Sequence, residues 1–345
     1  MKKKALITGV TGQDGSFLAE FLLSKNYEVH GIRRRSSQFN TMLIDHLIKD
    51  PLSNQTDFFI HYSDMTDPVS VNSVIAEIKP DEIYNLAAQS HVGLSFVMPK
   101  YTTEVNAIGT VSLLDCIKSN KLTNVKVYHA STSELYGNQN LKIYDKDSDF
   151  KPTSPYAISK LYAHLIVQNY RKAYDMFATN GILFNHESER RGSTFVSRKI
   201  TKALTKISNG SEEVLILGNL NSQRDWGYAK DYVEGMWLML QQDQPQDFII
   251  ATGESYTVRT FVNECLAYLK IDSVWEGKGI EERCINLKNG KTIVKVDKKY
   301  FRPSDVEFLK GDMNETQKIL NWKPKVKFKE LIKIMIDHDL DSLQN

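Results

Sequence analysis

The first half of the chain alternates short apolar runs with longer amphipathic stretches. The apolar runs are bounded by polar turns and predict strands over residues 4–8, 28–32, 57–62, 82–85 and 125–130. Apolar residues at helical spacing predict helices over 16–25, 67–78 and 103–118. This alternation predicts a doubly wound α/β fold, in which helices cover both faces of a parallel sheet.

The second half of the chain begins with the same rhythm and then loses it. A helix over 155–174 and a strand over 177–183 continue the pattern, which becomes irregular after Phe184. Loops with Arg and Gly then surround a predicted helix over 195–207 and strands over 214–217 and 248–251. We predict a larger domain over residues 1–184, to which residues near 229–253 return. A smaller α/β substrate-binding domain is expected over 185–345.

Charge and composition exclude several classes of protein. Lys and Arg total 44 against 42 acidic residues, so there is no basic excess that would indicate nucleic acid. No apolar run approaches the ~18 residues that span a bilayer. Thr8, Gly9 and Thr11 interrupt the apolar opening too early for a signal peptide. Three scattered cysteines lack metal-ligand spacing. We therefore expect a cytoplasmic protein without metal, membrane or nucleic-acid partner.

A glycine-rich turn follows the first predicted strand. Gly9, Gly12 and Gly15 lie at G-x-x-G-x-x-G spacing and lead into the first helix. Glycines permit a tight turn and let the backbone approach a pyrophosphate at the helix N-terminus. The spacing differs from the G-x-G-x-x-G of many dehydrogenases, so the pattern gains its weight from the strand–turn–helix context. It predicts a Rossmann-type dinucleotide site.

The end of the second predicted strand indicates which dinucleotide binds. NAD-binding proteins usually place Asp or Glu there, for the ribose 2′-OH. This chain has Arg33–Ser37 instead, a run of three Arg and two Ser. Cations and hydroxyls suit a 2′-phosphate, so we assign Arg34, Arg35 and Ser36 to that group and expect NADP. Asp64 follows the third strand, where such folds contact the adenine.

Two further segments carry candidate chemistry. Tyr156 and Lys160 lie four residues apart, hence on one face of a helix. A phenol with a pKa near ~10 is a weak base at neutral pH, but a neighbouring ammonium favours the phenolate. Upstream, Thr132, Ser133 and Glu134 follow a strand at the edge where open α/β sheets bind ligands. These hydroxyls and this carboxylate can orient a sugar and move a proton.

Together these motifs resemble the extended short-chain dehydrogenase/reductase family. Within it, five segments resemble the GDP-mannose 4,6-dehydratases: Gly9-Val-Thr-Gly-Gln-Asp-Gly, Arg34-Arg-Ser-Ser, Ser90-His-Val, Asn185-His-Glu-Ser with Arg190-Arg-Gly, and Arg224-Asp-Trp-Gly. The similarity runs nearly end to end, through Tyr300-Phe-Arg-Pro and Asn321-Trp-Lys-Pro. It implies a lyase that converts a GDP-linked manno-configured sugar into its 4-keto-6-deoxy derivative with tightly bound NADP.

The resemblance implies a role for each catalytic residue. Tyr156 would take the proton of the sugar O4 while hydride leaves C4 for NADP. Lys160 would hold the nicotinamide ribose and lower the pKa of Tyr156, and Thr132 would bind O4. Glu134 would then remove the C5 proton, which the C4 ketone acidifies, and water would leave from C6. The hydride would return to C6, so that the cofactor is regenerated.

The resemblance also assigns binding positions. Those matched to the cofactor are Gly9, Thr11, Gly12, Gln13, Asp14, Asp64, Met65, Leu86, Ala87, Ala88, Gln89, Ser90, Tyr101, Lys160, His186 and Arg191. Those matched to the substrate are Asn185, Lys199, Asn219, Arg224, Arg302 and Glu307, to which Ser90 and Ser133 at the ligand edge are added. The cations of the second set can neutralise a diphosphate.

The chain departs from the family pattern at two places, and these leave the sugar open. Glu189 replaces the proline of N-H-E-S-P-R-R-G, and the segment 277–300 is shorter than usual. GDP-D-glycero-α-D-manno-heptose is therefore an alternative to GDP-mannose. A nucleotide-sugar 4-epimerase and a non-catalytic NADP-binding regulator are rival functions. An epimerase needs no C5 base such as Glu134, and a regulator needs no intact catalytic set.

The loop over residues 33–40 bears on assembly. It holds more cations and hydroxyls than one 2′-phosphate requires. In the resembling family this loop reaches the cofactor site of a neighbouring subunit. The resemblance therefore implies a homo-oligomer, expected to be a tetramer with a dimer through paired helices as its minimum unit.

Overall fold

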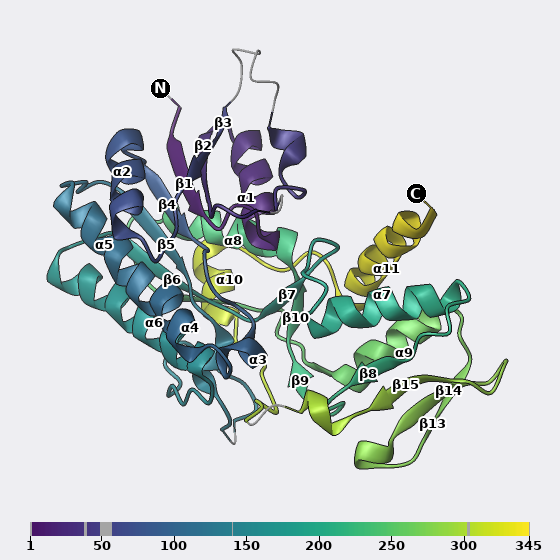
Figure 1. The fold of residues 1–345 in the computed structure, drawn as a ribbon. Helices are drawn as coiled ribbons and strands as arrows, with labels where there is room; N and C mark the ends of the chain where they lie inside the picture. The colour runs from purple at the N-terminus through teal and green to yellow at the C-terminus, as the bar shows by residue number, and fades with distance from the viewer. Residues whose placement is uncertain (1, 38–39, 49–56, 140, 302–303, 345) are drawn as a thin grey trace. The chain divides into compact units, whose positions relative to one another are not determined.

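The computed structural model describes residues 2–37, 40–48, 57–139, 141–301 and 304–344 of the 345-residue chain. The chain divides into two compact units (Figure 1). Unit 1 comprises Met1–Leu183, Ala229–Ile250 and Asp312–Lys323. Unit 2 comprises Phe184–Tyr228, Ala251–Gly311 and Pro324–Asn345. Residues 312–323, which fall inside the range expected for the smaller domain, thus belong to unit 1.

A seven-stranded parallel sheet forms the centre of unit 1. Its order is β11-β6-β5-β4-β1-β2-β3, and every neighbouring pair is parallel. The strands are β1 (Lys4–Thr8), β2 (Glu28–Arg33), β3 (Phe58–Tyr62), β4 (Glu82–Asn85), β5 (Lys126–Ala130), β6 (Ala178–Leu183) and β11 (Phe248–Ile250). The predicted doubly wound α/β fold is confirmed. The strand order reverses between β1 and β4, and open α/β sheets bind ligands at such a point.

Helices cover both faces of this sheet (Figure 1). The helices of unit 1 are α1 (Gln13–Ser24), α2 (Pro68–Ile78), α3 (Val92–Ser95), α4 (Pro99–Thr103), α5 (Gly109–Ser119), α6 (Pro155–Ala173), α8 (Ala229–Leu240) and α10 (Asn314–Leu320), with the short turns η1 (Asp45–Leu47) and η3 (Ser133–Tyr136). α1 packs against α8, whereas α2, α5 and α6 pack in sequence against one another. Each group buries its own apolar cluster against the sheet.

The helix expected over 103–118 begins earlier than the sequence indicates and contains a π turn. α4 starts with Pro99 at its first position, where the missing N–H costs no hydrogen bond. The π turn η2 (Glu104–Ile108) follows, and α5 continues from Gly109 to Ser119. Asn106 in this turn is buried and bonds both N and O of Gln89. Periodicity cannot show such a turn, because contacts from another segment hold it.

Unit 2 builds a core of its own. Its four-stranded sheet has the order β13-β14-β15-β8, with β8 (Leu215–Leu217), β13 (Ser273–Glu276), β14 (Arg283–Asn286) and β15 (Thr292–Val296). Two small ladders join β7 (Asn185–Glu187) to β10 (Trp226–Tyr228) and β9 (Gln223–Arg224) to β12 (Tyr256–Thr257). The helices are α7 (Val196–Ser208), α9 (Val258–Tyr268) and α11 (Phe328–Gln344), with the turns η4 (Gly279–Glu281) and η5 (Lys298–Tyr300).

The core of unit 2 centres on stacked aromatic rings. The ring of Phe328 stacks on Tyr256 with centroids 4.0 Å apart and on Trp226 at 5.9 Å. The helices α7, α9 and α11 pack against one another around this stack. Cys265 and Cys284 are free and buried there, as Cys116 is in unit 1. Within the described ranges, no helix combines the length and apolar character needed to cross a bilayer.

Candidate active site

The glycine-rich turn lies between β1 and α1, at the point where the sheet order reverses. Gly9 has φ 72°, and a Cβ added there would lie 2.9 Å from the Cα of Ala87. At Gly15 an added Cβ would lie 2.4 Å from the carbonyl oxygen of Gly9. The N–H of Gly12 donates to that same oxygen at 3.0 Å and closes the turn. Only glycine fits at positions 9 and 15, and the result is an open backbone surface at the start of α1.

Thr8 joins the glycine-rich turn to the segment after β4. Its buried hydroxyl accepts hydrogen bonds from the N–H groups of Leu86 and Ala87, each at 3.0 Å. The same hydroxyl donates to Asn85 Oδ1 at 2.8 Å. β1 and β4 flank the reversal point of the sheet. Thr8 therefore builds one continuous wall from residues 9–15 and 86–90, the two segments that the sequence assigns to a cofactor.

Gln89 lies in that wall but has its side chain occupied within the protein. Its amide nitrogen donates to Thr102 Oγ1 at 3.0 Å, and its amide oxygen accepts from the N–H of His91 at 2.6 Å. Its backbone forms the two bonds with Asn106 described above. The structure therefore gives Gln89 a scaffold role, whereas a direct cofactor contact rests on the resemblance alone.

The arginine run after β2 presents two exposed cations. Arg33 donates to the Tyr62 hydroxyl, and its guanidinium lies 4.6 Å above the Tyr62 ring. Arg34 and Arg35 are exposed, and Arg34 Nη1 donates to the hydroxyl of Tyr101 at 2.8 Å. The side chain of Arg33 thus has a structural contact with the last residue of β3. Arg34 and Arg35 remain accessible to an anionic group, and Tyr101 on α4 lies beside Arg34.

Asp64 and Met65 follow β3 and shape the same region. Asp64 Oδ1 accepts from Thr66 N at 2.9 Å and from Thr66 Oγ1 at 2.8 Å, which fixes a turn. Met65 is buried, and its Cβ would lie 2.9 Å from a Cβ added at Gly109. Gly109 therefore lets the start of α5 lie directly against Met65.

α6 carries Tyr156 and Lys160 into the protein interior. The helix begins with Pro155 at its first position, and Ser154 Oγ caps it by accepting from Ala157 N at 3.1 Å. Tyr156 and Lys160 are both buried. Lys160 Nζ donates to the carbonyl oxygen of Ala130 at 2.8 Å, and burial lowers the pKa of this ammonium to about 8. The cation therefore lies at the carboxyl end of β5.

The short turn η3 follows β5 and carries the other predicted catalytic residues. Thr132 is its N-cap, and the Thr132 hydroxyl accepts from Glu134 N at 3.2 Å. Thr132 and Ser133 are buried, whereas Glu134 is half-buried. α6 packs against η3. The structure therefore brings the Tyr156–Lys160 face of α6 and the residues 132–134 to the same edge of the sheet.

The positions matched to the cofactor in unit 2 lie around β7. His186 is buried, and its Nδ1 donates to the carbonyl oxygen of Phe184 at 2.8 Å. Arg191 lies 3.0 Å from Glu187 Oε2 in an ion pair and 3.7 Å from the ring centroid of Phe195. The unusual Glu189 is half-buried and accepts a long 3.4 Å bond from the hydroxyl of Tyr228. Glu189 is therefore tied to β10.

The positions matched to the substrate form two groups in unit 2. Arg224 is buried and forms an ion pair with Asp305 at 3.3 Å. The neighbouring residue Gln223 donates its N–H to the carbonyl oxygen of Glu307 at 2.7 Å, so Arg224 lies beside the segment of Glu307. Lys199 Nζ donates to Ile216 O at 2.6 Å and lies 3.9 Å from the ring centroid of Tyr300. Burial lowers the pKa of Lys199.

The structure shows fewer contacts for three further positions that are matched to the substrate. Asn185 lies half-buried on β7. Asn219 Oδ1 accepts from Asn221 N at 2.9 Å in a turn. Arg302 lies outside the described residues. Asp305, the partner of Arg224, was missed, because no sequence signal joins a carboxylate to a cation so distant in the chain.

Asp225 of the R-D-W-G segment also received no role from the sequence. Its buried carboxylate accepts from Thr252 N at 2.8 Å, Thr252 Oγ1 at 2.7 Å and Gly253 N at 3.0 Å. Burial raises the pKa of Asp225 to about 6. Its donors all lie within unit 2, so it joins the end of β9 to the segment after β11. Among the described residues, no three His, Cys, Asp or Glu side chains are arranged to hold a metal ion.

Comparison with solved structures defines the class of protein by its fold. UDP-glucose 4-epimerase from Thermotoga maritima, solved with UDP-glucose, matches with a TM-score of 0.82 at 20% identity and covers 99% of each chain. dTDP-glucose 4,6-dehydratase from Bacillus anthracis, solved with NAD, matches with a TM-score of 0.80 at 18% identity, over 99% of this chain and 98% of that chain. The chain has the Rossmann-type fold that these nucleotide-sugar enzymes share.

Sequence comparison identifies the family within that class. The model of the family described as GDP-mannose 4,6 dehydratase matches residues 6–335. The GDP-mannose 4,6 dehydratase of Cricetulus griseus is 54% identical over 99% of this chain and 93% of its own length. That of Homo sapiens is 53% identical over 99% and 92%, and that of Vibrio cholerae 50% over 100% and 95%. The chain belongs to the GDP-mannose 4,6-dehydratase family.

Proposed function

We propose that the protein converts GDP-mannose into GDP-4-keto-6-deoxymannose with bound NADP. The observation that carries this proposal is the meeting of α6 and η3. A Tyr–Lys pair suffices for chemistry at C4, and Lys160 Nζ on Ala130 O fixes that pair at the end of β5. Glu134 adds a carboxylate at the same edge, which chemistry at C5 requires. Relatives at 50–54% identity that carry the dehydratase name support the same reaction.

The residues of unit 1 fit a dinucleotide with a 2′-phosphate. A Cβ at Gly9 would fill the space beside Ala87, so the turn leaves room for a close backbone approach. Gly9, Gly12 and the N-terminus of α1 would hold the pyrophosphate. The exposed Arg34 and Arg35 would hold the 2′-phosphate, which NAD lacks. When bound, NADP supplies the hydride acceptor for C4 and later the hydride donor for C6.

The protein's own groups move the protons of this reaction. Tyr156, as the phenolate that Lys160 favours, takes the proton from the sugar O4, and Thr132 orients that oxygen. The new C4 ketone acidifies C5–H, and Glu134 removes that proton. Glu134 then gives that proton to the C6 hydroxyl, which leaves as water. Once C6 has been reduced, the phenol of Tyr156 gives its proton to O4 of the enolate, and this proton moves to C5 as the ketone is restored.

Mannose is the sugar that the comparisons favour. The three relatives described above, of 50–54% identity, are named for GDP-mannose, and the chain covers more than nine tenths of each of these three. Glu189, one of the two departures from the family pattern that make the heptose an alternative, lies beside Tyr228 in unit 2. We therefore propose GDP-mannose as the substrate and Lys199, Arg224 and Arg302 as the groups that neutralise its diphosphate.

The direct test is to incubate the protein with GDP-mannose or GDP-manno-heptose without added reductant. We expect GDP-mannose to give a 4-keto-6-deoxy product, with little product from the heptose. A product that is only epimerised at C4 would contradict the dehydratase proposal. Net formation of one NADPH per product would contradict the internal return of the hydride.

We also propose a tetramer, with α6 in its dimer contact. Ile158, Tyr162 and Leu165 lie along one face of α6 and are 57%, 45% and 49% exposed. An apolar stripe of this kind on a helix favours pairing with another helix. The loop over 33–40, to which the sequence assigns the second contact, lies partly outside the described residues.

A further inference from the structure

α6 is fastened to the end of β5 by two of its turns. Lys160 Nζ donates to Ala130 O at 2.8 Å, and His164 Nδ1 lies 3.0 Å from Ser131 Oγ. Lys160 and His164 are one turn apart on the same helix face, about 6 Å along its axis. Their partners are consecutive residues of the chain, and all four lie inside unit 1. His164 is 1% exposed and Ser131 4%.

The proton on His164 can be placed from its second contact. Gln168 Nε2 donates to Asp247 Oδ2 at 2.7 Å, because a carboxylate accepts only. The same amide nitrogen lies 3.1 Å from His164 Nε2, so this ring nitrogen accepts a hydrogen bond from the second N–H of the Gln168 amide. His164 Nε2 is 3.5 Å from Asp247 Oδ2, longer than a normal N–H···O bond. The ring proton is therefore assigned to Nδ1, which donates to Ser131 Oγ.

Asp247 is a fixed end for this chain of bonds. It precedes β11, forms an ion pair with Arg171, and accepts from Asn180 N and Asn180 Nδ2, each at 3.1 Å. Burial alone would raise the pKa of Asp247, but Arg171, His164 and Gln168 outweigh it and lower the pKa.

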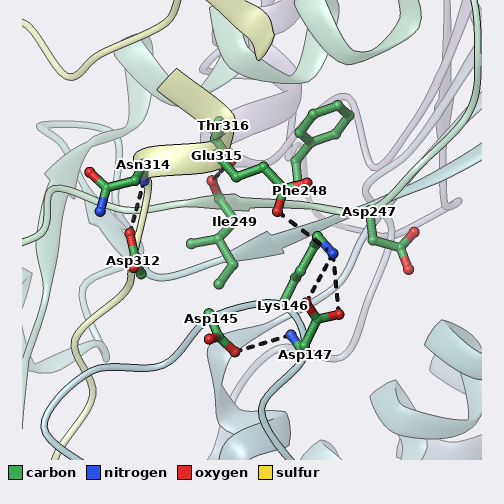
Figure 2. A pocket seen from close by; sticks show the side chains of 10 residues that line it. All are labelled: Asp145, Lys146, Asp147, Asp247, Phe248, Ile249, Asp312, Asn314, Glu315 and Thr316. Carbon is green, nitrogen blue, oxygen red and sulfur yellow. Dashed lines mark hydrogen bonds and ion pairs between the residues drawn. The ribbon is translucent and has the colours of Figure 1, made fainter. Parts of the chain in front are cut away.

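Asp247 also lines a cavity of about 220 Å³ (Figure 2). Lys146 lies in the same cavity and contacts Asp147 and Glu315 at 3.1 and 3.6 Å, whereas the Asp247 carboxylate points away from it. The charge of Asp247 therefore serves α6 rather than the cavity.

We propose that His164 is a positioning residue, whose Nδ1–H bond to Ser131 Oγ holds Thr132 in place relative to Tyr156 and Lys160. Ser131 is already bonded on its other side, because its N–H donates to Gly181 O at 2.9 Å. Thr132 follows directly in extended conformation, with φ −152° and ψ 146°, and its hydroxyl holds Glu134 N. His164 thus fixes Ser131, the residue at which the segment with Thr132 and Glu134 begins.

The effect on catalysis follows from geometry. A displacement of about 1 Å at a reacting group can lower a rate about 100-fold. Without the Nδ1–H donor, the Ser131 hydroxyl loses a buried partner, and residues 130–131, which lead into η3, lose one of their two hydrogen bonds to α6. The substrate-binding positions of unit 2 are untouched. The defect is therefore expected in kcat and not in KM.

The test compares two replacements of His164 in the full-length protein with bound cofactor. His164→Phe keeps a ring but removes the donor, and we expect kcat with GDP-mannose to fall about 10- to 100-fold while KM changes less than about threefold. His164→Asn places an amide N–H near the position of Nδ1 and should recover most of kcat. Val167→Ala, a buried change on the same helix, should lower stability and leave kcat within about twofold. Ser131→Ala should match His164→Phe, and the double variant should be no slower than either.

Two results would overturn the proposal: a His164→Phe variant with kcat within about twofold of the parent, or equal losses in all three single variants of α6. The proposal rests on the proposed dehydratase function only for this assay. If the parent is inactive on GDP-mannose, that function fails, and the assignment of the bond is still tested by ¹⁵N NMR of histidine-labelled protein without substrate.

In that spectrum, the signal lost in His164→Phe belongs to His164, one of eight histidines. We expect it to show the Nδ1–H tautomer. Burial lowers the pKa of His164 to about 4, Asp247 opposes that shift and Arg171 adds to it, so the signal should not titrate between pH of about 7.5 and 5.5. An Nε2–H tautomer, or titration near pH of about 6.5, would contradict the assignment.

Discussion

Lys160 Nζ lies 2.8 Å from the carbonyl oxygen of Ala130, so a buried ammonium is bonded to the last residue of β5. Thr132 and Glu134 follow only two and four residues later. One hydrogen bond therefore links the helix that carries Tyr156 to the segment that carries the proposed C5 base. This link places the proposed base for O4 and the proposed base for C5 at one edge of the sheet, an arrangement that a 4,6-dehydratase requires.

Replacement of Tyr156 by Phe should abolish turnover and leave NADP bound. In the proposed mechanism the Tyr156 hydroxyl takes the O4 proton, whereas the glycine-rich turn and the arginine run, on other segments, hold the cofactor. Turnover should fall at least about 100-fold, in the range for loss of a positioned base. Tyr170→Phe is the matched control, because Tyr170 lies on the same helix and its hydroxyl bonds Asp115 at 2.7 Å. Loss of cofactor from Tyr156→Phe, measured by absorbance of the released nucleotide, would count against this role.

The pH dependence of Lys160 should separate activity from stability. Burial lowers the pKa of Lys160 to about 8, so the ammonium that supports Tyr156 is lost as pH rises through about 8. We expect kcat/KM to fall on that alkaline limb.

Stability should move in the opposite direction. Between pH of about 8 and 10.5 the unfolded chain binds more protons at this lysine than the folded chain, so its contribution to the free energy of unfolding rises with pH. In cofactor-free protein, the free energy of unfolding of the parent relative to that of Lys160→Met should rise by about 2 kcal/mol between pH of about 7 and 9.5. Urea unfolding at both pH values measures this difference, and a parent that loses stability relative to the variant would show the sign to be wrong.

Replacement of Arg34 and Arg35 by Ala should weaken the preference of the protein for NADP over NAD. Each guanidinium that meets a phosphate contributes a charge-assisted hydrogen bond that NAD cannot use. The double variant should bind NADP about 10- to 100-fold more weakly and NAD almost unchanged. Arg283→Ala removes an exposed cation of unit 2, paired with Glu276, and should change neither affinity. Equal weakening of both dinucleotides in titration calorimetry would place the two arginines away from the 2′-phosphate.

A charge on the apolar stripe of α6 should break the assembly. Leu165→Glu places a carboxylate among Ile158 and Tyr162, and burying it in a helix pair is costly. Light scattering at micromolar concentration should show a tetramer for the parent and a smaller species for the variant. A parent that is monomeric, or a variant of unchanged mass, would remove α6 from the interface.

The sequence predicts the sheet of unit 1 because most of its strands are buried on both faces, the edge strand β3 being an exception. β1 and β4, for example, appear as short apolar runs bounded by polar turns. β13 alternates between half-buried and exposed positions, and β14 and β15 lie in a short segment with several charges. The apolar pattern of β13 and β14 is weak, and the apolar run of β15 is short and lies among charged residues, so the sequence predicts no strand at these three places.

In the candidate site, too, some features can be predicted from the sequence and others cannot. Tyr156 and Lys160 can be placed together because helical spacing is local. His164 and Ser131 are 33 residues apart, and only the packing of α6 on the end of β5 brings them to 3.0 Å. The same holds for Arg224 with Asp305 and for Gln89 with Asn106. Pairings between segments depend on the fold, and a single sequence does not show them.

The most direct test of the account is the Glu134→Gln variant mixed with GDP-mannose. The amide keeps the shape of the side chain and removes the basic oxygen, while oxidation at C4 still has Tyr156 and Lys160. A positioned base contributes roughly 10²–10⁴-fold, so 6-deoxy product should fall by that factor. Glu104→Gln, at a half-buried glutamate paired with Lys100, serves as the control. We predict that Glu134→Gln accumulates reduced nicotinamide, seen by its absorbance, with almost no 6-deoxy product. Formation of 4-keto-6-deoxy product at close to the parent rate would contradict the role of Glu134.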